Sequence, residues 1–212
     1  MKSESLVFAA AGTLVGFLGG WIIGSQHTIA RVPAAGMPAS VPAPATSAGN
    51  APSAPALDTA KVQAATGRAS AEPRNPAPRI ELGNLYFDAE QYQEAARWYQ
   101  EALAIDPSNA DVSTDLGVSF YYLNEPDRAL AQFDKSLAIN PKHSKTLLNL
   151  GIVRAFGKQD LPGAAKAWQE VIAVAPGSPE GQAARRALDA MRGAHPDVPG
   201  SAAPPSSGPG SD

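Results

Sequence analysis

Histidine and carboxylate side chains are the groups in this 212-residue chain with the chemistry for acid–base catalysis or metal binding. The three histidines are His27, His143 and His195, and none has a sequence neighbour at the spacing typical of metal ligands or of a general base. Cysteine is absent, which excludes disulfides and Cys-ligated zinc. Several carboxylates fall at predicted turns and helix starts, where they cap helices and complement the helix dipole. These are Asp106, Asp111, Asp115 and Asp127.

The sequence also lacks the motifs that build other kinds of active site. It contains no nucleophile motif and no Gly-rich loop of the type that holds phosphates. We therefore predict that the chain is not an enzyme and has no catalytic residue, metal site or cofactor. Residues 76–192 carry 12 Lys and Arg against 15 Asp and Glu, and this acidic balance argues against a nucleic-acid partner.

The elements that position the remaining side chains are indicated by a pattern that recurs every 34 residues. Each copy has a Leu-Gly pair, a small residue, an aromatic residue and a proline in the same order. The first copy has Leu82, Gly83, Tyr86, Ala95, Tyr99, Ala102 and Pro107. The second has Leu116, Gly117, Phe120, Ala129, Phe133, Ser136 and Pro141. The third has Leu150, Gly151, Ala164, Trp168, Val171 and Pro176.

This pattern resembles the tetratricopeptide repeat (TPR) family, in which each repeat is a pair of antiparallel helices. The resemblance covers about 120 residues and implies an all-α fold, a short solenoid of three helix–turn–helix repeats. We place the repeats at residues 76–109, 110–143 and 144–177, with a capping helix at 178–192. The small residues let the two helices of a repeat approach each other, and the prolines end the second helix.

The third copy departs from the pattern in two ways. It contains one extra residue, which we place in the turn between its two helices. Arg154 stands where an aromatic residue is usual, so the third helix pair is predicted to pack less tightly.

The N-terminal part of the chain predicts a membrane anchor. Residues 1–5 form a short tail, and Leu6 to Gly24 contain no charge over a length that spans the bilayer hydrocarbon as a helix. We place a transmembrane helix at residues 6–25; the alternative is a signal peptide cleaved near residues 30–35. The helix carries a stripe of glycines at four-residue spacing, which favours helix association and a homodimer, although glycine is also common in membrane helices. The stripe consists of Gly12, Gly16, Gly20 and Gly24.

Two segments are rich in Ala, Pro, Ser and Gly and poor in large apolar side chains. Residues 26–75 and 193–212 are therefore predicted to be disordered, the first as a linker and the second as a tail. A weak helical patch is possible near Leu57 to Ala65. The linker is expected to be an inert spacer; the alternative is a Pro-rich ligand.

The TPR resemblance implies that the first helices of the repeats line a concave groove that holds a partner peptide or helix. Transferring the groove positions with the 34-residue frame gives a mostly apolar and aromatic floor, although each side chain could instead pack against the next helix. The predicted groove residues are Asn84, Phe87, Asp88, Thr114, Val118, Tyr121, Tyr122, Lys145, Leu148, Asn149, Ile152 and Phe156.

One TPR subfamily binds the C-terminal carboxylate of a chaperone with a set of Lys, Asn and Arg side chains. Asn84 and Lys145 match that set, but Ile80, Asp115 and Asn149 stand at the other positions. Because Asp115 would repel a carboxylate, we predict a mostly apolar partner segment instead.

The layout of anchor, linker and repeats is similar to that of membrane-anchored bacterial TPR proteins. It implies an adaptor or assembly factor on the inner membrane, with the repeats in the periplasm. Two alternatives remain at this point, a self-assembling scaffold and an accessory subunit of a membrane enzyme complex such as cytochrome c maturation machinery.

Overall fold

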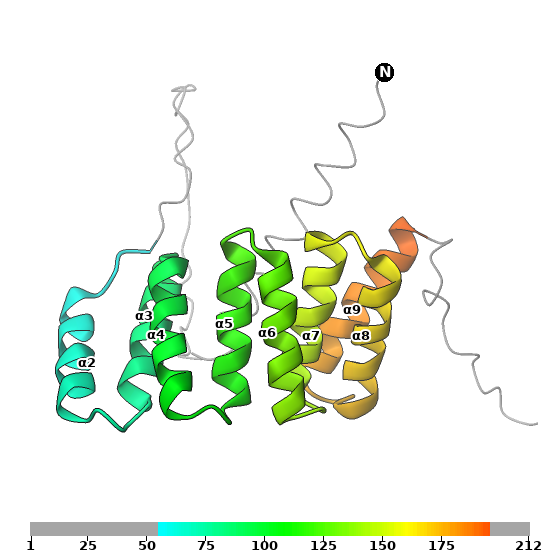
Figure 1. The fold of residues 1–212 in the computed structure, drawn as a ribbon. Helices are drawn as coiled ribbons and strands as arrows, with labels where there is room; N and C mark the ends of the chain where they lie inside the picture. The colour runs from blue at the N-terminus through cyan, green and yellow to red at the C-terminus, as the bar shows by residue number, and fades with distance from the viewer. Residues whose placement is uncertain (1–54, 196–212) are drawn as a thin grey trace, which may run out of the picture. The chain divides into compact units, whose positions relative to one another are not determined.

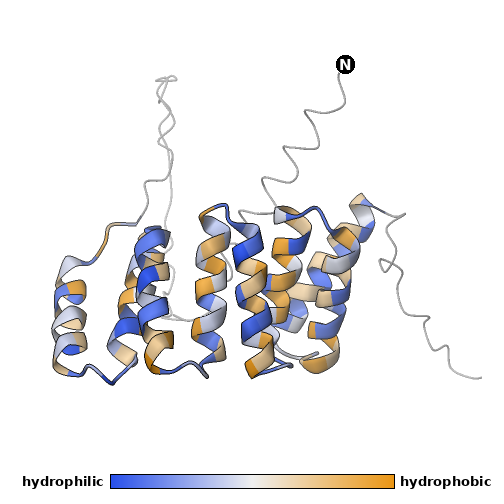
Figure 2. Ribbon diagram, in the orientation of Figure 1, coloured by the Kyte–Doolittle hydropathy of each residue, from blue (hydrophilic) through white to orange (hydrophobic). Residues whose placement is uncertain are grey.

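A computed structural model describes residues 55–195, which form a row of antiparallel helices (Figure 1). This part of the chain contains eight α-helices, one π-helical turn and no strand. The helices are α2 (Thr59–Ala71), α3 (Ala77–Asp88), α4 (Tyr92–Ile105), α5 (Ala110–Tyr122), α6 (Pro126–Ile139), α7 (Ser144–Ile152), α8 (Leu161–Val174) and α9 (Pro179–Ala194), and the π-helical turn η1 (Val153–Gly157) continues α7. Hydrophobic and hydrophilic positions are interleaved along each helix, as expected of amphipathic helices that share a core (Figure 2).

Side-chain caps and prolines set the ends of several helices. The side chain of Asn109 accepts a hydrogen bond from the backbone N–H of Val112 at 3.0 Å and starts α5. Asp160 and Ser178 cap α8 and α9 in the same way. The predicted repeat prolines lie just beyond the ends of α4, α6 and α8, so the all-α solenoid expected from the sequence is the fold that forms.

The two helices of each repeat meet where an aromatic ring lies against a glycine. A Cβ atom added to Gly83 would collide with the Tyr99 ring, and one added to Gly117 would lie 2.5 Å from Cε1 of Phe133. Gly151 has the same relation to Trp168 in the third repeat. All three rings are buried, so the glycines are packing positions that let each ring lie against a helix backbone.

The prediction that the extra residue of the third repeat lies in the turn is wrong, because the residue lies in the first helix. In every repeat the residue with positive φ, Glu90, Asn124 or Gln159, lies five positions before the small residue of the second helix. The turns therefore have equal length, and the insertion falls between Gly151 and Gln159. It is accommodated by η1, where the Lys158 N–H donates to the Val153 carbonyl at 3.1 Å across five residues.

The π-helical turn also changes the interpretation of Arg154. With the insertion counted, the buried Ala155 takes the frame position of Tyr86 and Phe120, and Arg154 lies half-exposed beside Asp160 at 3.7 Å. A small residue thus replaces the usual aromatic residue, and the arginine is turned to the surface.

The linker prediction is wrong over its last part, because residues 59–71 form helix α2, of which the sequence indicated only a weak helical patch near residues 57–65. Ala65 and Ala69 are buried against Leu82, and Arg68 forms an ion pair with Glu81 at 2.6 Å. The helix lies one 34-residue period before α4, so it occupies the place of a second helix from a preceding half-repeat. Its apolar face consists mainly of alanine methyl groups, and this is why composition alone suggested disorder.

At the other end, α9 forms where the capping helix was predicted and continues to Ala194, so the tail predicted from residue 193 begins two residues too early. No helix within residues 55–195 is long and apolar enough to cross a membrane. The predicted anchor at 6–25, its glycine stripe, the linker up to residue 54 and the tail from residue 196 lie outside the described residues.

We predict opposite effects for two Gly→Ala substitutions in helices. Gly117→Ala should destabilise the fold by about 1–3 kcal/mol, because the new methyl group displaces the Phe133 ring. Gly67→Ala in α2 should stabilise it by about 0.5–1 kcal/mol, because no atom lies within 4 Å of the added Cβ. Urea unfolding of both variants measures the difference, and equal effects would contradict the packing role of Gly117.

Candidate functional site

The first helices of the repeats, α3, α5 and α7 with η1, carry the predicted groove residues, and we call this side the A-helix face. Five of the twelve are buried and offer a partner little surface. These are Thr114, Val118, Leu148, Asn149 and Ile152. Val118 belongs to the hydrophobic core, and the Asn149 amide donates to the Lys145 carbonyl at 2.8 Å. These five side chains pack within the fold, so they are removed from the residues predicted to contact a partner.

The other seven predicted residues keep accessible surface. Asn84 and Asp88 are exposed, and Phe87, Tyr121, Tyr122, Lys145 and Phe156 are half-exposed. The Asn84 side chain also accepts a hydrogen bond from the Tyr99 hydroxyl at 2.7 Å, which orients it from the core.

An aromatic cluster forms where α3, α4 and α5 meet. Tyr92 stacks on Tyr122 with ring centroids 4.6 Å apart, and Phe87 meets both rings edge-on at 5.2 and 5.6 Å. Tyr121 lies beside Tyr122 at 5.9 Å. Tyr92 was missed from the sequence because it begins a second helix, where the other repeats carry Pro126 and Leu161. Nothing in the 34-residue pattern indicates an aromatic residue there.

The hydroxyl groups of this cluster stay neutral at physiological pH. Burial, followed by the nearby charge of Glu90, raises the pKa of Tyr92 to about 12. Burial and then Glu90 also raise the pKa of Tyr122, and burial raises that of Tyr121. The cluster therefore offers ring faces and neutral hydroxyl groups to a partner, which suits apolar contacts with a few hydrogen bonds.

An ion pair lies at the centre of the A-helix face. Lys145 Nζ is 2.7 Å from Asp115 Oδ1, and each side chain is 25% exposed. Burial raises the pKa of Asp115, and the charge of Lys145 opposes that rise. Because Asp115 already neutralises Lys145, this cation is not available as a separate site for a partner's carboxylate.

His143 has partners that its sequence position did not indicate. Its Nδ1 is 2.6 Å from the Thr146 hydroxyl, and its Nε2 is 3.3 Å from Asp111 Oδ1. The Thr146 hydroxyl also contacts those of Thr114 and Ser136 at 2.6 and 2.8 Å. The 34-residue frame brings these residues of neighbouring repeats together.

Asp111, His143 and Thr146 contact one another in sequence like the groups of a proton relay, but the Thr146 hydroxyl is buried. Thr146, Thr114 and Ser136 have no accessible surface, so no substrate can reach them. The network satisfies buried hydroxyl groups between repeats. Within residues 55–195, no cluster of His, Cys, Asp and Glu could hold a metal ion.

Comparisons with known proteins agree with this geometry. Family models described as "TPR repeat" and "Tetratricopeptide repeat" match residues 83–124 and 114–179. A search of curated proteins found no significant match. The crystal structure of MamA is similar with a TM-score of 0.53 and 21% identity, covering 61% of this chain and 76% of that one, which supports the fold alone.

Two further solved TPR domains resemble the chain more loosely. The first TPR of Spaghetti (RPAP3), bound to the HSP90 peptide SRMEEVD, has a TM-score of 0.49 and 25% identity over 56% of this chain and 94% of that one. The Sgt2 TPR domain from Aspergillus fumigatus has a TM-score of 0.48 and 24% identity over 58% and 85%.

The fold and the A-helix face thus define an α-helical repeat module of the solenoid class, whose members generally bind other proteins. Within that class, residues 83–179 match models of the TPR family.

We predict that Lys145→Met destabilises the fold in a pH-dependent way. Without Lys145, the Asp115 carboxylate loses the main group that offsets its burial, and only the smaller effect of His143 remains, so its folded-state pKa rises further. A raised carboxyl pKa costs stability above that pKa, and the cost falls as the pH approaches the unfolded value of about 3.9. Urea unfolding should show a loss of about 1–3 kcal/mol at pH 7 and a smaller loss at pH 4.5.

The control is Lys158→Met, which removes a more exposed ion pair to Asp127. Its cost should stay below about 1 kcal/mol at both pH values. An equal loss for Lys145→Met at both pH values would contradict the role given to Asp115.

Proposed function

We propose that this protein is a membrane-tethered adaptor that holds an apolar peptide or helix of a partner protein on its A-helix face. The observation that carries the proposal is the row of half-exposed aromatic side chains Phe87, Tyr121, Tyr122 and Phe156. Three of these belong to or contact one ring cluster, so they are already ordered before a partner arrives. Rigid aromatic side chains lose little conformational entropy on binding and are common interaction hot spots.

The charges on the same face support an apolar partner segment rather than a free carboxylate. Lys145, which matches the chaperone-binding subfamily, is held by Asp115 at 2.7 Å. Asp88 and Asp111 add further negative charge to this side. A partner with a terminal carboxylate would have to displace the ion pair and approach these aspartates.

The tether rests on the sequence of the N-terminal segment. Residues 6–24 are uncharged and long enough to span a bilayer as a helix. We propose that this segment tethers the repeats on the periplasmic side of a bacterial inner membrane. An adaptor in this position would gather a partner near the membrane, as an assembly factor does.

Site-specific photo-cross-linking in membranes of the source organism tests the proposal. A benzophenone amino acid replaces Tyr121 or Phe156 on the A-helix face in the full-length chain. We expect both positions to cross-link to the same protein. The matched control replaces Lys166, an exposed residue on α8, and should not yield that product.

A second change shows whether the cross-link depends on the aromatic cluster. Phe87→Ala should reduce the cross-link from position 156 while the circular dichroism melt still shows a cooperative transition. A product that forms equally from Lys166, or that persists in Phe87→Ala, would assign binding to another surface. Deletion of residues 1–25 should release the protein from the membrane fraction, and protease added outside the inner membrane should cleave the repeats.

A further inference from the structure

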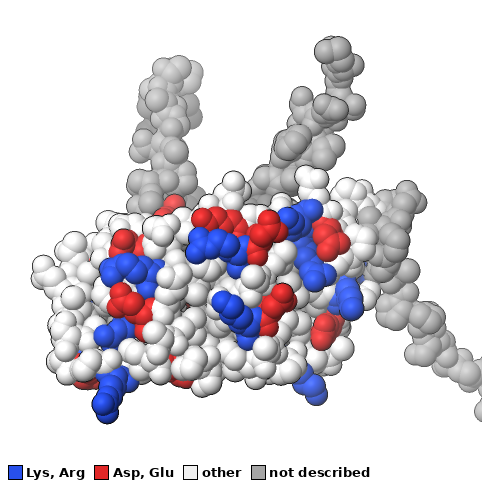
Figure 3. Space-filling view, viewed as in Figure 1, with Lys and Arg blue, Asp and Glu red and all other residues white. Residues whose placement is uncertain are grey.

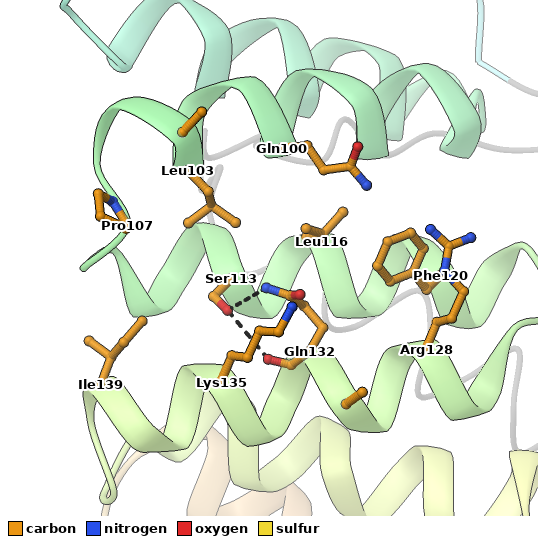
Figure 4. A pocket seen from close by; sticks show the side chains of 12 residues that line it. Gln100, Leu103, Pro107, Ser113, Leu116, Phe120, Arg128, Gln132, Lys135 and Ile139 are labelled. Atoms are coloured by element: carbon orange, nitrogen blue, oxygen red, sulfur yellow. Dashed lines mark hydrogen bonds between the residues drawn. The ribbon is translucent and has the colours of Figure 1, made fainter.

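A second surface feature lies on the other side of the repeats, between the second helices of the first two repeats. Figure 4 shows a groove bordered by α4 and α6, with α5 lying between them. It encloses about 510 Å³, a size within the range of ligand sites. On α5 it uses Leu116 and Phe120, which lie two residues before Val118 and Tyr122 and therefore about 200° around the helix from them. The groove is separate from the A-helix face.

The floor and one end of the groove are apolar. Leu103 on α4 and Leu116 and Phe120 on α5 line it, and Ile139 closes the end formed by α6. Ile139 is 39% exposed and is the one large hydrophobic residue within residues 55–195 that is exposed and not buried or half-buried. Ile139 therefore extends the apolar lining of the groove to the surface.

The charges that line the groove have one sign. Arg128 and Lys135 both contribute to it, and no carboxylate does. The Arg128 guanidinium lies 3.9 Å above the Phe120 ring and forms an ion pair with Glu125. Lys135 forms no ion pair with any other residue of the described part of the chain.

Comparison of the repeats shows that this charge pattern is peculiar to α6. On α4 the matching positions are Glu94, Arg97 and Glu101, and Arg97 pairs with both glutamates at 3.0 Å. On α6 the same positions, 34 residues later, are Arg128, Ala131 and Lys135. The two glutamates of α4 thus pair with Arg97, and Glu101 also pairs with Arg79 of α3. On α6 two bases flank a small residue, and because Arg128 pairs with Glu125, Lys135 supplies the positive charge beside the groove.

We propose that this groove is a second docking site, which binds a partner segment combining a bulky apolar side chain with an Asp or Glu. The apolar side chain would cover Leu103, Leu116 and Ile139, and the carboxylate would pair with Lys135. A nucleic acid fits the surface poorly, because Lys and Arg lie next to Asp and Glu over the face that contains α4 and α6 (Figure 3). The positive charge is local to the groove, which suits one or two carboxylates.

A peptide selection with the full-length chain tests the proposal. The probe is a phage-displayed library of random 12-residue peptides, selected on the wild type after depletion on Lys135→Glu/Ile139→Gln. Both replaced side chains are exposed, so the variant is expected to fold, and its thermal melt is checked. We expect the retained peptides to carry Leu, Ile or Phe within a few residues of Asp or Glu.

Single variants then locate the site. Lys135→Glu and Ile139→Gln should each weaken binding of a retained peptide by about tenfold, since a rim charge and an apolar contact are lost. Lys166→Glu, an equal charge change on α8, and Phe87→Ala on the A-helix face should leave binding unchanged. A peptide with Lys in place of its acidic residue should bind Lys135→Glu better than the wild type.

Four results would overturn the proposal. They are retained peptides without acidic residues, binding that is insensitive to Lys135→Glu, binding that is lost in Phe87→Ala, or no peptide that prefers the wild type over the depletion variant. Light scattering tests whether a second copy of this chain occupies the groove instead. If the wild type forms a dimer that Ile139→Gln abolishes, the groove is a contact between two copies of this chain.

Discussion

The contact of an aromatic ring with the backbone at a glycine is the interaction on which the rest of this structure depends. It occurs once in each repeat, at Gly83 with Tyr99, Gly117 with Phe133 and Gly151 with Trp168. Each contact sets the distance between the two helices of a repeat, and that spacing determines where the next helix can pack. The A-helix face and the groove between α4 and α6 are both consequences of this spacing, because each is built from side chains of neighbouring helices.

The two surfaces follow from the two sides of one helix, α5. Tyr122 keeps accessible surface on the A-helix face, and Leu116 and Phe120 line the groove. The A-helix face has neutral aromatic hydroxyl groups and an ion pair that satisfies itself. The groove has an exposed isoleucine and a lysine without an ion pair in the described chain. The A-helix face therefore favours an apolar partner segment, whereas the groove favours a segment that combines an apolar side chain with a carboxylate.

Most of the fold could be predicted from the sequence, because the repeat pattern reports the packing positions directly. The glycines, rings and prolines identify six helices and their order, and Ser178 with Pro179 identifies the seventh. Helix α2 could not be predicted in this way, since Ala65 and Ala69 bury little surface and stand where other repeats have larger residues. The π-helical turn was also hidden, because a count of residues detects an insertion without showing which backbone segment accommodates it.

The candidate site was only partly predictable. The frame placed Phe87, Tyr121 and Tyr122 on one face, but it could not show that Thr114 and Asn149 would be used in hydrogen bonds within the fold. Tyr92 and the pairing of His143 with Asp111 depend on contacts between elements. Such contacts are set by helix packing, which a single repeat pattern does not encode.

Helix α2 has a mechanical consequence for any force applied to the N-terminal side of the chain. It is the first helix of the described residues. Ala65 and Ala69 hold it against Leu82, with Tyr86 and Trp98 packed beside them, and Arg68 forms a half-exposed ion pair with Glu81. Its 13 residues span about 20 Å as a helix and about 43 Å when extended. Peeling α2 from α3 would therefore lengthen the connection by about 20 Å and leave the aromatic-on-glycine contacts of the three repeats intact. Under such a force, α2 would detach before the two binding surfaces are deformed.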